Sequence, residues 1–426
     1  MSWWQTRGRA ELVVFAVALV PRLLWVGYIE HQGRGLFGPD APSYDALALS
    51  LLEGHGLAKQ DYGGLFTDPG ESLTVRSFRP PLLPAVLAGI YGVAGHRLWA
   101  ARVVMAVLGA GTCVVVMAVA RRLFDRRTAV LAGLLTAVYP KLVYYAGMLV
   151  TETMCTYLLA VAVALLLAAW QAEAGWSRWL AGGVALGLAA LTRSSLLLFA
   201  PVAALWVLVA RSRRRRALWE AALVLVGFAV VMTPWWVRNY RVHGRFVAAT
   251  TEGGYTLWVT NNPRADGGGH CFLPEQTGEF DGLTEAEIDR LFWRKGMAWI
   301  RTHPGEFLRL VGAKLVRFWR LWPHAEHVGT ATAVVAGVTF APVLLLALWG
   351  LARARSRWRP VLLLILLFGY YTALHAVFMA ITRYRVPIVP YLIVLAAWGA
   401  VDVWGRVRGR REEEDDGDAD EGMSDG

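Results

Sequence analysis

Several charged residues stand at the edges of long apolar segments, where they could bind an anion together. Glu152 begins one such segment, Arg193 follows another, and Arg383 and Arg385 directly precede a third. Charges beside hydrocarbon are costly and usually face a partner or a cavity. Guanidinium groups bind phosphates and carboxylates through paired hydrogen bonds. The pattern therefore indicates a site for a phosphate-like group, although each arginine alone could instead extend to the membrane surface.

Asp40 is the acid whose position best suits catalysis. It lies in Gly38-Pro39-Asp40-Ala41-Pro42, about ten residues beyond the first apolar segment. A carboxylate at the mouth of an apolar cavity can accept a proton from an attacking group, and nearby arginines can stabilise a departing phosphate. Asp40 could instead cap a helix over Tyr44–Leu52. Asp45 is the next candidate for the base.

Two further segments add cations to this set. Arg79 precedes Pro80-Pro81, and Arg238 and Asn239 follow the apolar segment that ends in Pro234-Trp235-Trp236-Val237. We expect Arg79, Arg193, Arg238 and Arg383 to line one pocket at the same membrane face.

Motifs of soluble enzymes are absent from the sequence. It contains no P-loop, no His-Glu-x-x-His and no Cys-x-x-Cys. His324 and His327 are too few for a metal site, which takes three or four ligands. Three cysteines cannot build a disulfide framework. We therefore expect no metal and no cofactor.

The composition is that of an integral membrane protein. The chain has 426 residues, of which 56% are hydrophobic and 18% are charged, against about 25% charged in ordinary soluble domains. A helix that crosses the bilayer needs about 20 mostly apolar residues. The uncharged stretches predict an all-α membrane protein of about ten transmembrane helices, over residues 11–29, 98–119, 128–146, 149–169, 178–193, 194–210, 217–236, 331–351, 360–380 and 384–403.

Arginine clusters predict how these helices are oriented. The clusters lie near residues 7–9, 121–127, 211–216, 353–359 and 406–411, and threading the helices places all of them on one side. The positive-inside rule makes that side cytoplasmic. Both termini are then cytoplasmic, and the polar set lies at the outer ends of the helices. Residues 80–95 are short and are expected to lie in the interface or to re-enter.

The chain is expected to form one membrane module over residues 1–403, with long outer loops at 30–79 and 237–330. Thr284-Glu285-Ala286-Glu287 is a capping box that predicts a helix over Thr284–Thr302, followed by another near 304–320. Residues 404–426 are basic and then acidic, which predicts a disordered cytoplasmic tail. The spacing Gly183-x-x-x-Gly187 indicates close helix packing.

The order of these motifs resembles the GT-C superfamily of membrane glycosyltransferases, especially family 39. That family includes the protein O-mannosyltransferases and the lipid A aminoarabinose transferase. The resemblance covers about residues 11–403 and implies a GT-C-type bundle with two long outer-face loops. It rests on Asp40-x-x-x-Tyr44, Arg79-Pro80-Pro81, Glu152, Leu191-Thr192-Arg193, Pro234-Trp235-x-x-Arg238-Asn239-Tyr240 and Arg383-Tyr384-Arg385-x-Pro387.

The resemblance also implies a reaction. A sugar would move from a polyprenyl-phosphate-linked donor to an acceptor on the non-cytoplasmic face of the cell membrane, usually with inversion. Asp40 would be the catalytic base or an acid that binds the acceptor, and Arg79 would contact the donor phosphate. The resemblance implies substrate-binding roles for Tyr44, Arg79, Glu152, Arg193, Arg238, Asn239, Arg383 and Arg385.

Two departures from the family pattern leave the substrates open. Ala41 follows Asp40 where many relatives carry a second acid, and Phe78 stands where the aminoarabinose transferase has an acid. The sugar is therefore not implied, and the acceptor could be a protein, a lipid or a cell-wall glycan.

A lipid flippase or polytopic transporter for a lipid-linked saccharide is the alternative function. Transporters usually place charges near the membrane midplane on broken helices and contain internal repeats. Here most charges gather at the outer ends, and no clear repeat is found. A non-catalytic scaffold would leave Asp40 and Arg79 unexplained.

Overall fold

The computed structural model describes residues 3–38, 40–60, 73–172, 175–268, 279–280, 282–323 and 329–421, and the side chains within these ranges except those of residues 3–7, 60 and 409–421. The helices are α1 (Trp3–His31), α2 (Ala41–Leu52), α3 (Leu82–Ala94), α4 (Leu98–Leu123), α5 (Arg126–Val138), α6 (Pro140–Ala146), α7 (Thr151–Gln171), α8 (Trp176–Thr192), η1 (Ser194–Leu196), α9 (Phe199–Ala210), α10 (Arg214–His243), α11 (Gly253–Val259), α12 (Glu285–Thr302), α13 (Pro304–Trp319), α15 (Thr330–Arg353), η2 (Arg355–Arg357), α16 (Trp358–Val377), η3 (Thr382–Ile388) and α17 (Val389–Glu421). Strands β1 (Lys59–Gln60) and β2 (Thr74–Val75) form a short antiparallel ladder.

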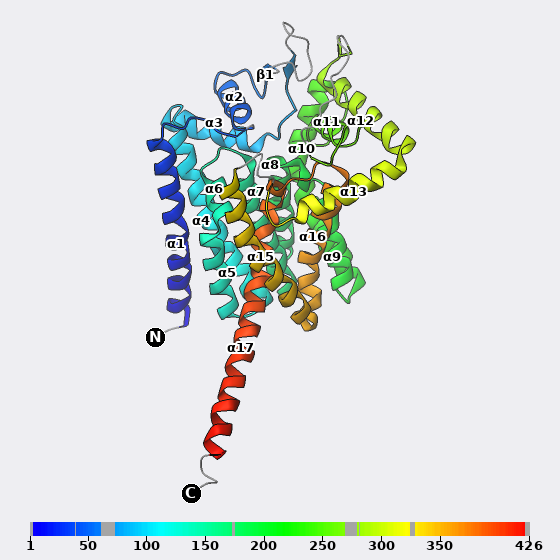
Figure 1. Cartoon of the computed structure of the whole chain (residues 1–426). Helices are drawn as coiled ribbons and strands as arrows, with labels where there is room; N and C mark the ends of the chain where they lie inside the picture. Colours follow the sequence, from blue (N-terminus) through cyan, green and yellow to red (C-terminus); the bar gives the residue numbers. More distant parts are fainter. Residues whose placement is uncertain are drawn as a thin grey trace.

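The long helices run alongside one another in a bundle (Figure 1). Among the described residues, seven helical segments are long and apolar enough to cross a membrane: α1, α4, α7, α10, α15, α16 with η2, and α17 with η3. The pair α5–α6 adds an eighth, bent by 55° at Pro140. Because the residue before a proline disfavours the helical conformation, the helix breaks there. The protein is therefore a helical, multi-pass membrane protein, as its sequence predicts.

The two remaining predicted spans are shorter than a full crossing. The predicted span 178–193 corresponds to α8 (Trp176–Thr192), of 17 residues, and the span 194–210 corresponds to η1 and the 12-residue α9. At 1.5 Å per residue α8 rises about 26 Å, against about 30 Å for the hydrocarbon core. Arg193 separates them with an extended backbone (φ −149°, ψ 115°). The turn predicted at Arg193 is confirmed.

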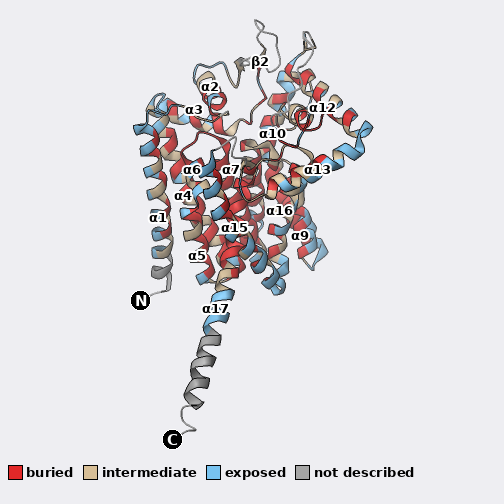
Figure 2. Cartoon of the chain, viewed as in Figure 1, coloured by how far each residue is buried: buried red, intermediate tan, exposed pale blue. Residues whose placement is uncertain are grey.

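Small residues let α8 and α10 pack closely. A Cβ at Gly183 would come within 2.1 Å of the Val224 carbonyl oxygen, and one at Gly187 within 2.7 Å of Val231 Cβ. The glycine spacing therefore serves helix packing, as the sequence predicts. Buried residues fill the middle of the bundle, between α4, α5, α7 and α15 (Figure 2).

Shorter elements gather at the end of the bundle opposite to both marked termini (Figure 1). Here α2 and the two strands come from the first predicted loop, α3 comes from the segment 80–95 that follows it, and α11 and α12 come from the second loop. With 13 residues, α3 is about 20 Å long, too short to cross a membrane. The predicted capping box of Thr284 and Glu287 opens α12, and α13 follows it.

The C-terminal segment differs from the expectation. Residues 404–421, expected to be disordered, continue α17 as a helix that extends beyond the bundle (Figure 1). Arginine, glutamate and alanine have high helix propensity, which favours continuation of the helix through this charged segment. Residues 422–426 lie outside the described residues.

Candidate active site

Asp40 lies directly before α2, and the turn before it requires glycine. Gly38 has φ +88°, a conformation that L side chains rarely adopt, and a Cβ there would lie 2.5 Å from Met148 Cε. The Asp40 carbonyl accepts the N–H groups of Ser43 and Tyr44 at 3.0 and 3.2 Å, but its carboxylate caps no N–H of α2. Asp40 therefore occupies the N-cap position of α2 without a side-chain cap, and its carboxylate is available for other partners.

Those partners are two arginines from distant parts of the chain. Arg79 Nη2 lies 2.7 Å from Asp40 Oδ1, and Arg383 Nη1 lies 2.7 Å from Asp40 Oδ2. The second terminal nitrogen of Arg79, Nη1, lies 2.8 Å from Glu252 Oε1. Arg79 thus bridges an acid of the first loop and an acid of the second.

Glu152 begins α7 and is fully buried. Arg193 Nη1 donates to its Oε1 at 2.9 Å and to Thr151 Oγ1 at 3.0 Å. Arg383 donates to both carboxylate oxygens, from Nε to Oε1 and from Nη2 to Oε2 at 3.1 Å. Glu152 is therefore a fixed anchor that positions two guanidinium groups.

These six side chains form one continuous series of ion pairs, in the order Glu252, Arg79, Asp40, Arg383, Glu152, Arg193. We call it the ion-pair chain. It holds three guanidiniums and three carboxylates, so it is formally neutral. An anionic ligand would compete with the carboxylates for the guanidinium nitrogens. The ion-pair chain is therefore suited to bind a phosphate, which would replace a carboxylate as the partner of an arginine.

Asp40 and Glu252, the two carboxylates that lie in loops, differ in how strongly their surroundings favour the ionised form. Burial raises the pKa of Asp40, but the guanidiniums of Arg79 and Arg383 outweigh it and hold this pKa below its usual value. Burial raises the pKa of Glu252 above its usual value, and the charge of Asp40 adds to this effect. The guanidinium of Arg79 lowers the same pKa but does not outweigh burial. Glu252 is therefore the easier of the two to protonate.

Aromatic rings surround the three guanidiniums. The Cζ atom lies 5.7 Å from the Tyr44 ring centre for Arg79, 4.7 Å from that of Tyr384 for Arg193, and 6.0 Å from that of Tyr145 for Arg383. Such cation–π contacts stabilise the charges and exclude water. Tyr44, predicted from the sequence, therefore lies beside the ion-pair chain.

Arg238 and Asn239 reach a neighbouring cluster instead. Arg238 Nη1 donates to Ser77 Oγ at 2.6 Å, and Ser77 Oγ donates to Asn239 Oδ1 at 3.0 Å. Ser77 lies two residues before Arg79, so this cluster holds the segment that carries Arg79. Of the four arginines expected in one pocket, three meet and Arg238 contacts them through this segment.

Arg385 faces another part of the molecule. Its Nη1 donates to the carbonyls of Phe318 and Arg320 at 2.9 and 2.8 Å, and its Cζ lies 3.8 Å from the Phe340 ring centre. In a 3₁₀-helix such as η3, residues two apart point about 120° away from each other. Arg385 therefore ties η3 to the end of α13, while Arg383 reaches the ion-pair chain.

Glu252 was missed by the sequence reasoning. It directly precedes α11, which packs on α12: Gly254 N donates to Asp289 Oδ1 at 2.7 Å, and Trp293 lies against Gly253. The only signal was an acid beside two adjacent glycines in an outer loop, Glu252-Gly253-Gly254. That pattern is common in loops and does not indicate a partner.

Gly254→Ala should loosen the element that carries Glu252. A Cβ at Gly254 would lie 2.1 Å from the backbone oxygen of Asp289, whereas one at Gly253 would first meet the Trp293 side chain at 3.3 Å. We expect Gly254→Ala to cost about 1–3 kcal/mol in the free energy of unfolding, measured by thermal or denaturant unfolding in detergent. Gly253→Ala is the matched control, and an equal loss in both variants would contradict this account.

A clasp formed by Glu285 joins the two outer loops. Its carboxylate accepts the backbone N–H of Arg76 at 2.7 Å and that of Ser77 at 3.0 Å, and it also accepts the hydroxyl of Thr251. Thr251 N in turn donates to Ser77 O at 3.0 Å. The clasp therefore fixes the segments that carry Arg79 and Glu252 relative to each other.

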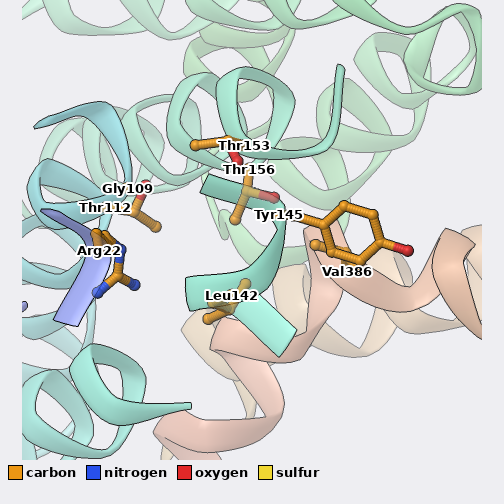
Figure 3. Close-up of a pocket in the computed structure, with 8 residues that line it drawn as sticks. All are labelled: Arg22, Gly109, Thr112, Leu142, Tyr145, Thr153, Thr156 and Val386. Atoms are coloured by element: carbon orange, nitrogen blue, oxygen red, sulfur yellow. The ribbon is translucent and has the colours of Figure 1, made fainter. Parts of the chain in front are cut away.

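A small cavity lies inside the bundle beside Tyr145, the residue whose ring centre lies 6.0 Å from Arg383 Cζ. It is lined by Arg22, Gly109, Thr112, Leu142, Tyr145, Thr153, Thr156 and Val386, and it has room for about one water-sized centre (10 Å³). Figure 3 shows Arg22 and Tyr145 on opposite sides of this space. Arg22 is fully buried and donates to the carbonyls of Ala18 and Ala137 at 2.7 and 2.8 Å. Through these hydrogen bonds Arg22 links α1 to α5.

Among the described residues, no group of three or more His, Cys, Asp or Glu side chains could hold a metal ion. His324 and His327 lie outside the described residues.

Comparison with known proteins agrees with this architecture. Residues 78–237 match the family described as dolichyl-phosphate-mannose-protein mannosyltransferase. No curated protein matches the chain by sequence. The match covers the segment from Phe78 to Val237, which carries Arg79, Glu152 and Arg193.

Solved structures of membrane enzymes share the fold. The oligosaccharyltransferase AglB of Archaeoglobus fulgidus, in complex with an inhibitory peptide and a dolichol-phosphate, has 17% identity and a TM-score of 0.58, covering 97% of this chain and 52% of its own. The apo form of the Archaeoglobus fulgidus enzyme has 15% identity and a TM-score of 0.61, over 97% and 52%. ArnT from Cupriavidus metallidurans bound to undecaprenyl phosphate has 18% identity and a TM-score of 0.54, over 95% and 62%.

This chain spans between half and two thirds of the length of those structures. The likeness nevertheless extends over almost all of this chain, and both enzymes have the fold that the sequence motifs predict. The chain therefore has the fold of the GT-C membrane glycosyltransferases.

Proposed function

We propose that this protein is a membrane glycosyltransferase that uses a polyprenyl-phosphate-linked sugar donor and acts on the non-cytoplasmic face. The observation that carries the proposal is Asp40 held between Arg79 and Arg383 at one end of the bundle. Two of the similar structures contain a dolichol-phosphate and undecaprenyl phosphate, respectively. Residues 1–403 would form the catalytic module, and the acceptor is a protein, a lipid or a cell-wall glycan.

The proposed reaction uses the ion-pair chain in two ways. An acceptor hydroxyl attacks the anomeric carbon, the bond from that carbon to the phosphate oxygen breaks, and the hydroxyl proton passes to Asp40. The polyprenyl monophosphate leaves with the electron pair of the broken bond, and guanidiniums stabilise its developing charge. Attack opposite to the leaving phosphate inverts the anomeric centre.

Binding of the donor would also prepare Asp40 for its role. The pKa of Asp40 lies below its usual value because Arg79 and Arg383 outweigh the effect of burial. When a donor phosphate binds beside these arginines, its negative charge raises the pKa of Asp40. Asp40 is then a stronger base at the moment when the acceptor arrives.

The other predicted residues would bind the phosphate, line the site or hold its segments in position. Glu152 and Arg193 would hold Arg383 and bind the phosphate, and Tyr44 would line the site. Arg238 and Asn239 would position the Arg79 segment through Ser77, and Arg385 would hold η3.

Cysteine labelling would test the proposed topology, in which both termini are cytoplasmic. We expect a cysteine at exposed Gly305 of α13 to react with an impermeant reagent in intact cells, and one at exposed Ser212 to react only after permeabilisation. Gly305 has open space around its Cβ position, so the substitution is accommodated. Both variants are made in a chain that lacks its native cysteines. The opposite labelling pattern would place the ion-pair chain in the cytoplasm and overturn the proposal.

The direct test supplies purified protein with polyprenyl-monophosphate sugars and, separately, with nucleotide sugars. We expect transfer from the lipid-linked donor only. Turnover with a nucleotide sugar alone would contradict the proposal. Translocation of a lipid-linked saccharide across vesicles without any transfer would favour the flippase alternative.

A further inference from the structure

Because the ion-pair chain is neutral, the negative charge of a bound ligand would need to be compensated by a further change in the site. Its three guanidiniums are matched by three carboxylates. A phosphodiester brings one more negative charge into a site where water is largely excluded. Unpaired charge in such surroundings is costly, and a buried group often changes its protonation state instead. This requirement rests on the proposed function, which supplies the phosphodiester.

The three carboxylates are not equivalent in their ability to take up a proton. Glu152 is fully buried and bound by two arginines. Asp40 also has two arginine partners, and the proposed reaction needs it ionised. Glu252 has one ion-pair partner in the chain, Arg79, and 28% of its side chain is exposed. It is therefore the weakest-held carboxylate, and its exposure compares with 21% for Asp40 and 0% for Glu152.

The geometry of Arg79 couples this carboxylate to the ligand. Arg79 uses Nη1 for Glu252 and Nη2 for Asp40, so its two terminal nitrogens are both engaged. A phosphate that replaces an acid on this fork can do so at Nη1 or at Nη2. Displacing Glu252 leaves Asp40 in place as the base and frees Nη1 for a phosphate oxygen.

We propose that Glu252 is the charge-compensating residue of this site: it releases Arg79 and takes up one proton when the donor phosphate binds. Burial already raises the pKa of Glu252 in the absence of ligand. Loss of Arg79 and the added phosphate charge both raise that pKa further. The donor should therefore bind together with one proton, and Glu252 acts through Arg79 rather than on the sugar.

The sign of the pH dependence follows from the groups around Glu252. From neighbouring elements it faces Arg79, Arg193 and Arg383, which favour its ionised form, and Asp40, which disfavours it. Tyr44, Tyr384 and Asp289 also face it. Below the pKa of free Glu252 the proton is already bound and affinity is greatest. Affinity falls as pH rises toward the pKa of the complex.

Asp289 requires a control because it also titrates in this range. Burial raises the pKa of Asp289 to about 6. It lies on α12, and its carboxylate accepts the N–H of Gly254 in α11, the helix that Glu252 directly precedes. It does not belong to the ion-pair chain. Asp289→Asn keeps this hydrogen-bond acceptor and removes the charge.

The test measures binding of a polyprenyl methyl phosphodiester to purified protein from about pH 5 to about pH 8. This probe carries one negative charge throughout, so its own titration does not contribute. We expect the wild-type Kd to rise with pH, by up to about tenfold per unit. Calorimetry in buffers of different ionisation enthalpy should show uptake of one proton.

The variants decide whether Glu252 is responsible. Glu252→Gln should bind with a Kd that no longer depends on pH and that approaches the low-pH wild-type value. Glu252→Asp and Asp289→Asn should both retain the dependence. A pH-independent wild type, or a dependence that survives in Glu252→Gln or disappears in Asp289→Asn, would overturn this inference alone. Failure of the wild type to bind the probe at any pH would instead overturn the proposed function.

Discussion

Asp40→Asn should lower the rate of sugar transfer by about 10²–10⁴-fold, because a positioned general base contributes that much. The variant should still bind the lipid-linked donor, since an amide oxygen can accept from Arg79 and removal of a negative charge favours an anionic ligand. Donor binding and transfer are measured on the same detergent-purified protein. A single-turnover assay with saturating donor then isolates the chemical step.

Asp45→Asn is the matched control for this variant. Asp45 lies on the same helix, α2, and is buried, but its carboxylate accepts the Tyr91 hydroxyl at 2.7 Å and lies 2.9 Å from His96 Nε2. It does not belong to the ion-pair chain. Transfer close to the wild-type rate in Asp40→Asn, with a large loss in Asp45→Asn, would transfer the role of the base to Asp45.

Arg383→Ala should be the most damaging of the arginine variants. Arg383 contacts Asp40 through Nη1 and Glu152 through Nε and Nη2, so its loss removes a cation from two acids at once. If it also faces the developing phosphate charge, we expect a loss of about 2–4 kcal/mol in transition-state stabilisation. Arg383→Lys should recover only part of this, because one ammonium cannot reproduce the fork.

Arg385→Lys provides the comparison within the same 3₁₀-helix. Arg385 binds two carbonyl oxygens and no member of the ion-pair chain. We expect its effect to fall mainly on thermal stability, with kcat/KM changed far less than in Arg383→Lys. Equal losses of kcat/KM in the two lysine variants would mean that η3 acts as a whole and that Arg383 has no special role.

Hydropathy predicted the long helices because a helix needs about 20 mostly apolar residues to cross the hydrocarbon core of a membrane. Charge at the ends of apolar segments likewise led us to expect Arg79, Arg193 and Arg383 in one place, and they lie in one series of ion pairs. A residue's depth in the membrane can be derived from its position along an apolar segment. Its direction around the helix axis cannot be derived in this way, which is why Arg238 was expected in the same pocket and Arg385 was expected to bind substrate.

Glu252 and the α8–α9 break illustrate the limits in other ways. Glu252 lies in a loop with no periodicity, and its partner Arg79 is distant in sequence, so only tertiary structure brings them together. Residues 179–192 and 194–210 carry no charge, and Arg193-Ser194-Ser195 between them indicated the turn, but the second span divides into η1 and α9 rather than forming one helix. Close backbone packing through Gly183 sets where α8 lies.

The clasp of Glu285 has a consequence for how such enzymes diversify. Because backbone N–H groups of Arg76 and Ser77 are held by an acid more than two hundred positions later in the chain, the two long loops are structurally coupled. A chimera that exchanged only the second loop with a relative would displace Arg79 even though residue 79 itself was unchanged. New acceptor preferences should therefore arise by joint replacement of both loops, and recombination within the bundle should be tolerated only where the pair remains together.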